Sequence, residues 1–199
     1  MSKNKKSLKF WLIAGIAFVL MIALDQFTKY LAYTNLRGQE DAVWIKNVFV
    51  LHYLENQSAA FGKDPVTLLN NALHFTSNAT TLLTAKMVFL SLLTIVVVIL
   101  IAWILRRIPE TKRFQPLNVL LVIFCAGAVG NLIDRIAHNY VIDFFYFELI
   151  NFPVFNVADI YVTCSAILLL ILGVFYYKDK DYEQIFPSRK KHEEETPED

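Results

Sequence analysis

Residues 87–105 read MVFLSLLTIVVVILIAWIL, a run without a single charged side chain. Its only polar members are serine and threonine. A helix needs about 20 mostly apolar residues to cross the hydrocarbon core of a bilayer. The run has that length, so we expect it to form a helix that spans a membrane.

Three other segments have a similar length and hydropathy: 10–33, 117–136 and 157–177. Hydrophobic residues make up 56% of the 199 residues and charged residues only 19%, a balance that is rare in soluble domains. The first segment follows several lysines, as in a signal peptide, but it is long and no small-x-small cleavage site follows it. We therefore expect a retained anchor and four transmembrane helices in a single domain, residues 1–177.

Lysine and arginine residues concentrate on one side of the four predicted spans. They cluster before the first span, between the second and third, and after the fourth, whereas 138–157 has none and 34–83 has only Arg37, Lys46 and Lys63. Short loops rich in these residues stay in the cytoplasm. Both termini are therefore expected to be cytoplasmic, and the two poorly charged segments are expected on the outer side.

The two outer segments contain sequence that is typical of strands. Residues 43–55 and 140–155 are rich in β-branched and aromatic side chains, which favour strands and also suit the membrane interface. Residues 65–83 are expected to form a short helix or a loop. The charged tail, residues 178–199, has the composition of a disordered segment.

Five ionisable residues fall inside or at the ends of the predicted spans: Asp25, Lys29, Asp134, Arg135 and Asp159. Charges in a membrane are costly, which makes these residues functional candidates. The helix directions place them near the outer side. A proton-coupled carrier could use such carboxylates, but they lie on one side only and no inverted repeat is visible. A non-catalytic scaffold is a second alternative, and it would tolerate the loss of Asp134 or Asp159. A third is another type of intramembrane aspartyl peptidase, but the Gly-x-Gly-Asp motif of those enzymes is missing, since Asn131 follows Gly130.

Asp134 and Asp159 occur in the same local pattern, Asn-x-x-Asp, which begins at Asn131 and at Asn156. Residues three apart share a helix face, so each carboxyl has an amide beside it. Two close carboxyls cannot both ionise easily, so one can act as a base on water while the other donates a proton. The helix dipoles favour an ionised Asp159 and a neutral Asp134, unless Arg135 turns toward Asp134.

Simpler structural roles exist for several of these residues. Asn156 can cap a helix that has Asp159 in its first turn. Asp25 can pair with Lys29 one helical turn away. Asp143 is expected to anchor the second strand segment.

Composition argues against two other classes of protein. The net charge is +1, and no basic stretch interleaved with aromatic residues indicates nucleic acid binding. Cys125 and Cys164 lie in apolar runs, the four histidines are scattered, and the HExxH pattern is absent. We therefore expect neither a nucleic acid partner nor a metal site.

Five short motifs occur in order along the chain, and together they resemble those of the bacterial lipoprotein signal peptidase family, signal peptidase II. They are Asp25-Gln26-Phe27-Thr28-Lys29, NQSAAFG (residues 56–62), GAVGNLIDR (residues 127–135), Val141-Ile142-Asp143-Phe144 and Phe155-Asn156-Val157-Ala158-Asp159.

The resemblance implies an aspartyl peptidase that removes signal peptides from prolipoproteins by cutting just before a cysteine that carries diacylglycerol. It implies that Asp134 and Asp159 are the catalytic residues and that water is the nucleophile, with no cofactor. The residues implied to line or support the site are Asp25, Asn56, Asn131, Arg135 and Asn156.

The resemblance also implies the architecture and the setting. The expected fold is an all-α membrane core of four transmembrane helices, with an extracytoplasmic β-cradle and a short surface helix. The expected partners are prolipoproteins and membrane lipid. We expect a monomer in the bacterial inner membrane, with its active site at the extracytoplasmic face.

Overall fold

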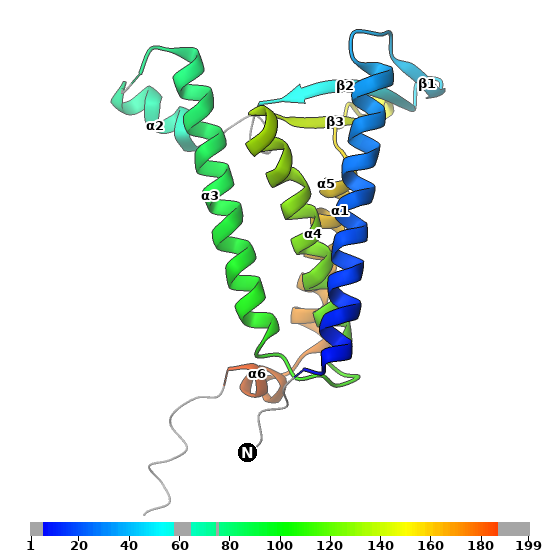
Figure 1. Cartoon of the computed structure of the whole chain (residues 1–199), viewed down its shortest axis with the longest axis vertical. Coiled ribbons are helices and arrows are strands. Elements are labelled where there is room, and N and C mark those ends of the chain that lie inside the picture. The colour runs from blue at the N-terminus through cyan, green and yellow to red at the C-terminus, as the bar shows by residue number, and fades with distance from the viewer. Residues whose placement is uncertain (1–5, 58–64, 75, 187–199) are drawn as a thin grey trace, which may run out of the picture.

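The computed structural model describes residues 6–57, 65–74 and 76–186, and within them four helices are long and apolar enough to cross a membrane. They are α1 (Leu8–Leu36), α3 (Ala79–Leu105), α4 (Gln115–His138) and α5 (Val157–Ile171), which continues as a π-helical turn over Leu172–Tyr176. These four helices confirm the predicted number of spans. Figure 1 shows them running along the long axis of the molecule, as in a multi-pass membrane protein.

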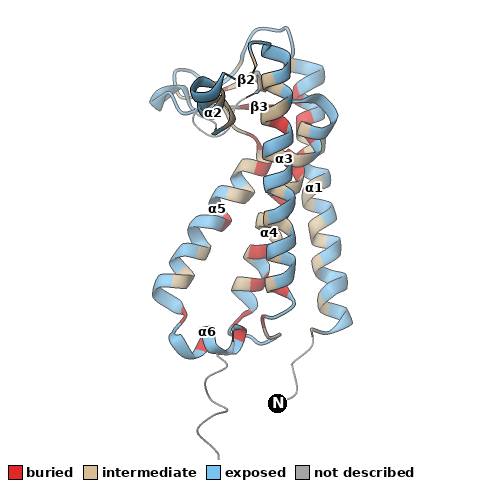
Figure 2. Ribbon diagram, turned by 90° about the vertical axis from the view of Figure 1, so that its left-hand side faces the viewer, coloured by how far each residue is buried: buried red, intermediate tan, exposed pale blue. Residues whose placement is uncertain are grey.

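Helix α4 lies at the centre of the bundle and packs against α1, α3 and α5. A Cβ added at Gly127 would lie 2.5 Å from the carbonyl oxygen of Ala158, and one at Gly130 would lie 2.5 Å from the carboxylate of Asp25. Small residues let membrane helices approach this closely. Many of the buried residues lie on α4, while the outward faces of α1 and α3 are exposed and apolar, as lipid-facing surfaces are (Figure 2).

A three-stranded antiparallel sheet covers one end of the bundle, which we call the sheet end (Figure 1). Its strands are β1 (Ala42–Ile45), β2 (Phe49–Asn56) and β3 (Val141–Tyr146), in that order across the sheet. Both segments predicted to contain strands therefore do so. The second segment continues as a 3-10 turn, η2 (Glu148–Ile150), before it reaches α5.

Local capping explains two of the element boundaries. Helix α3 begins at Ala79, earlier than the expected Met87, because Asn78 Oδ1 accepts hydrogen bonds from the first backbone N–H groups of the helix. Helix α4 ends at His138, and its C-cap Asn139 has a φ of 62°, in the left-handed region that asparagine tolerates. The chain then turns directly into β3. The predicted short helix is α2 (Pro65–Leu73), which lies beside the sheet end of α3 (Figure 1).

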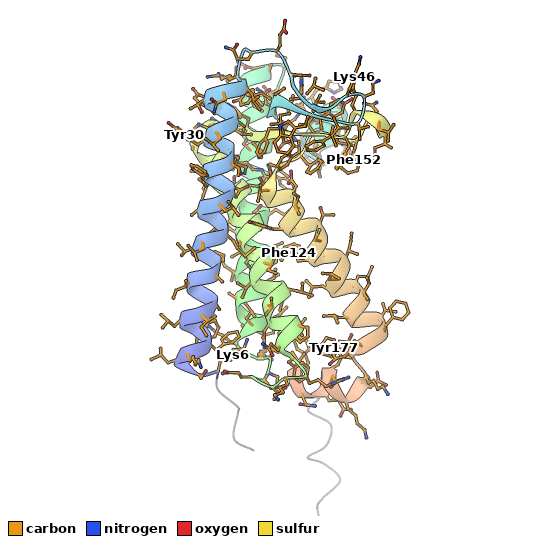
Figure 3. All side chains as sticks on the ribbon, turned by 90° about the vertical axis from the view of Figure 1, so that its right-hand side faces the viewer. Lys6, Tyr30, Lys46, Phe124, Phe152 and Tyr177 are labelled. Atoms are coloured by element: carbon orange, nitrogen blue, oxygen red, sulfur yellow. The ribbon has the colours of Figure 1, made fainter. Side chains whose placement is uncertain are left out.

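The opposite end of the bundle, which we call the termini end, is closed by helix α6 (Asp179–Ile185). Figure 3 labels Lys6 and Tyr177 at this end, and Lys46 and Phe152 at the sheet end. The disorder predicted for residues 178–199 is therefore wrong where the structure describes the tail, while residues 187–199 lie outside the described part.

Helix α6 is held by both charge and apolar packing. Arg113 donates hydrogen bonds to the two carboxylate oxygens of Asp181, at 2.9 and 2.6 Å. Ile185 joins Phe114 and Tyr177 in a buried apolar cluster beneath the bundle. The charges in this segment suggested a solvated tail, but a bidentate arginine and one buried apolar face are enough to order it.

Candidate active site

Polar side chains are buried together at the sheet end, where α1, α4, α5 and β3 meet. Their exposed fractions are 6% or less, in a part of the molecule whose other surfaces are largely apolar. The buried members are Asp25, Lys29, Asn131, Asp134, Asp143 and Asn156. Asp159 is only partly buried. Buried charges need partners, so the contacts of each carboxyl indicate what it can do.

Lys29 is the cation at the centre of this group. Its Nζ lies 2.9 Å from Asp25 Oδ2 and 3.0 Å from Asp134 Oδ2, and it donates a hydrogen bond to Asn131 Oδ1 at 2.9 Å. The structure thus contains the predicted Asp25–Lys29 pair and adds a second carboxylate from α4. One ammonium between two carboxylates joins α1 to α4 in a charge network.

Asp134 receives further hydrogen bonds on both oxygens. Gln26 Nε2 donates to Oδ1 at 3.0 Å, and the backbone N–H of Ile142 donates to Oδ2 at 3.1 Å. Hydrogen bonds and a close cation stabilise the ionised form of a carboxyl group. Both oxygens of Asp134 are therefore engaged by neighbouring groups of the protein.

Asp159 lies in the first turn of α5 and forms a capping box with Asn156. Asn156 Oδ1 accepts a hydrogen bond from the N–H of Asp159 at 2.9 Å, and Asp159 Oδ2 accepts one from the N–H of Asn156 at 3.2 Å. The capping role considered for this pair is therefore present. Asn131 Nδ2 also donates to Asp159 Oδ1 at 2.8 Å, so an amide from α4 fixes the carboxylate on α5.

Asp143 is a buried carboxyl bonded by two amides. Asn56 Nδ2 donates to its Oδ2 and Asn156 Nδ2 to its Oδ1, both at 2.7 Å. Burial raises the pKa of Asp143 to about 7; the charge of Asp159 adds to this rise and the two amides oppose it. Asp143 and Asp159 therefore share Asn156 and also interact through their charges.

Arg135 adds a hydrogen-bond donor to the same region. Its Nε is buried and has no hydrogen-bond partner among the residues that the structure describes. Its guanidinium interacts electrostatically with three carboxyls, those of Asp159, Asp134 and Asp143. An unpaired buried donor in this position is available to a substrate carbonyl.

The structure brings the predicted site residues into one network, but it changes their grouping. Asp25 and Asp134 gather around Lys29, whereas Asn156 lies between Asp143 and Asp159. Sequence reasoning treated Asp143 as a strand anchor, although an acidic residue flanked by Val141, Ile142 and Phe144 could have indicated a buried carboxyl. The NQSAAFG motif is described only at Asn56 and Gln57, and its remaining residues lie outside the described part.

Comparisons with known proteins point to one family. The family model described as "Signal peptidase (SPase) II" matches residues 17–175. The lipoprotein signal peptidase of Clostridium tetani is 37% identical over 173 residues, which cover 84% of this chain and 94% of that protein. The lipoprotein signal peptidase of Caldanaerobacter subterraneus is 38% identical over 164 residues, covering 82% of this chain and 95% of the relative.

Solved structures agree at the level of the fold. Two structures described as bacterial membrane enzymes align with TM-scores of 0.64 and 0.66. They are 24% and 23% identical in sequence, and they cover 87% and 89% of this chain and 92% and 100% of their own chains. The four-helix arrangement with its small sheet therefore recurs in enzymes of bacterial membranes.

Proposed function

Because this chain belongs to the signal peptidase II family, and so is an aspartic-type protease that removes signal peptides from prolipoproteins, we propose that it cuts just before the diacylglyceryl-modified cysteine. The acyl chains of such a substrate remain in the bilayer, so its scissile bond stays near the membrane boundary. The buried carboxyls lie at the sheet end of the helices, close to where that bond would be presented.

The proposed catalytic pair is Asp143 and Asp159. The observation that supports this pair is the pKa of Asp143, which burial and the charge of Asp159 raise to about 7. A carboxyl that is neutral near pH 7 beside an ionised one is the arrangement in which one group donates a proton and the other accepts one. Asp134 is the alternative partner from the family motif, but its carboxylate is already engaged by Lys29, Gln26 and the N–H of Ile142.

In the proposed reaction, the Asp159 carboxylate takes a proton from a water molecule whose oxygen attacks the scissile carbonyl carbon. Protonated Asp143 donates its proton to the carbonyl oxygen, which gives a neutral tetrahedral intermediate. The C–N bond then breaks as the leaving nitrogen takes the proton held by Asp159, and the new carboxyl returns a proton to Asp143. The two carboxyl groups relay every proton in this cycle and return to their starting states, with water as the only co-reactant.

The other polar residues have positioning roles in this proposal. Asn56 and Asn156 orient Asp143, and Asn131 orients Asp159. The unpaired Arg135 Nε–H is available to a backbone carbonyl of the substrate. Lys29 holds Asp25 and Asp134 together and so fixes α1 against α4 beneath the site.

The test compares three substitutions in full-length enzyme reconstituted with a diacylglyceryl-modified prolipoprotein peptide. Asp143→Asn and Asp159→Asn are expected to lower kcat/KM about 1,000-fold while the protein stays folded, because each removes a proton-transfer group. Asp134→Asn is expected to keep most of the activity per folded molecule but to lower stability by about 3 kcal/mol, because it leaves a buried charge network incomplete.

The same experiment can overturn the choice of residues. If Asp143→Asn keeps full turnover and Asp134→Asn abolishes it with an unchanged thermal unfolding temperature, Asp134 is the partner of Asp159. If all three variants turn over fully, neither pair is catalytic. The proposed chemistry requires no metal, so EDTA is expected to leave the rate of the wild-type enzyme unchanged.

A further inference from the structure

A groove of about 460 Å³ lies between α1 and α4 at the termini end, far from the buried carboxyls. On α1 it is lined at four-residue intervals by Lys9, Ile13, Ala17 and Met21, which share one helix face. On α4 it is lined by apolar residues that include Val122.

The length of this groove matches one leaflet of a bilayer. Lys9 and Met21 are twelve residues apart on a continuous helix, which is about 18 Å at 1.5 Å per residue. Half of a hydrocarbon core of about 30 Å is about 15 Å. The apolar part of the groove therefore reaches from the polar boundary of the membrane to about its midplane.

The mouth of the groove carries unpaired positive charge. Lys9 and Lys112 both line it, and neither has an ion-pair partner among the residues described in the structure. The one acidic lining residue, Glu110, accepts a hydrogen bond from Ser7 Oγ at 2.8 Å and lies near Lys6. Its charge is therefore already engaged, and the two lysines remain available to an anion.

We propose that this groove binds an anionic phospholipid from the leaflet on the termini side. One acyl chain lies between Ala17 of α1 and Val122 of α4, and the phosphate lies between Lys9 and Lys112. The signal peptide of a substrate is the competing apolar occupant, but its own amino-terminal region is basic and would be repelled by the lysines. The lipid site does not depend on the proposed catalytic pair, which lies at the other end of the bundle.

The test measures lipid retention by the full chain in mixed detergent micelles, using native mass spectrometry. Phosphatidylglycerol is expected to stay bound while phosphatidylcholine of the same chain length does not. The double variant Lys9→Gln/Lys112→Gln is expected to weaken phosphatidylglycerol binding about 30-fold, which corresponds to about 1 kcal/mol for each lysine near a membrane surface. Ala17→Phe, which fills the groove, is expected to abolish retention without altering the charges.

Matched controls separate the groove from general surface charge. Arg106→Gln/Lys180→Gln removes two exposed positive charges at the same end but outside the groove, and it should leave binding unchanged. Glycerol phosphate, which has the anion without the chains, should not displace the lipid. Equal retention of both lipids, or equal losses in the two double variants, would refute the site, and the lysine variants decide the matter even if Ala17→Phe does not fold.

Discussion

Asp134 and Asp143 differ in the groups that contact them directly although each is only 1% exposed. Asp134 lies 3.0 Å from an ammonium group, whereas Asp143 is bonded by two neutral amides and repelled by Asp159. Burial favours the neutral form of a carboxyl group, and hydrogen bonds to its charged form oppose this effect. At the residue scale, burial and the charge of Asp159 together outweigh the two amides at Asp143, and the pKa of this carboxyl rises to about 7.

A pH profile tests the protonated role of Asp143. Because its pKa is about 7, the acid form that donates a proton disappears as the pH rises through 7, and kcat/KM should fall about tenfold per unit above that point. Asn56→Ala removes an amide that stabilises the carboxylate, so the pKa rises and the falling limb should move up by about one pH unit.

The exposed Asn35 provides the control for this profile. Among the described residues, its side chain forms hydrogen bonds only within α1, so Asn35→Ala should leave the profile in place. A limb that moves to lower pH in Asn56→Ala would contradict a donor role for protonated Asp143.

Sequence reasoning identified most of the residues in this buried network but not which carboxyl groups contact Lys29. The Asn-x-x-Asp pattern identified the amide beside each carboxyl, because a spacing of three residues places two side chains on the same face of a helix. The partner of Lys29 could not be identified in this way, since the ammonium can reach a carboxylate either on its own helix or on α4. Only the packing of α1 against α4 shows that it reaches both.

Helix packing depends on glycine at specific points of α4. A Cβ at Gly127 would approach the Ala158 carbonyl oxygen to 2.5 Å and two side-chain atoms on α5 to 2.9 Å, so helix α5 would have to move. Gly15, on the lipid side of α1, has nothing within 4 Å of an added Cβ. At the element scale these two glycines should therefore respond in opposite ways to the same substitution.

Gly127→Ala is expected to destabilise the protein by about 2 kcal/mol, because overpacking forces α4 and α5 apart. Gly15→Ala is expected to be neutral or to stabilise by up to about 1 kcal/mol, since alanine is the better helix former. Equilibrium unfolding in mixed micelles measures both values. Equal effects at the two positions would show that the close approach of α4 and α5 is not a packing constraint.

The ion pair of α6 gives a second prediction at this scale. Arg113 lowers the pKa of Asp181 to about 2, below its ordinary value, so the pair stabilises docking above about pH 4 and this contribution is lost as the pH falls toward 2. Asp181→Asn should raise hydrogen exchange in α6 at pH 7, and wild type and variant should converge in acid. The pair joins residues 68 positions apart, which explains why local composition did not reveal it.

The expected orientation of the whole molecule in the membrane follows from the placement of its lysines and arginines. Both described ends of the chain lie at the termini end, and the sheet with the candidate active site lies at the other. The predicted orientation places the termini end in the cytoplasm. In a chain lacking its own two cysteines, Gln39→Cys should react with a membrane-impermeant maleimide in intact cells. Gln184→Cys should react only after lysis, and the reverse result would invert the topology.

The length of α1 has a consequence for the choice of membrane. Its 29 residues extend for about 43 Å, well beyond a hydrocarbon core of about 30 Å, and Asp25 lies about 25 Å from its start. A helix with such hydrophobic mismatch must tilt or protrude. The height of the carboxyls above the lipid tails therefore varies with bilayer thickness, so membranes with longer acyl chains draw the site into the apolar layer, away from water.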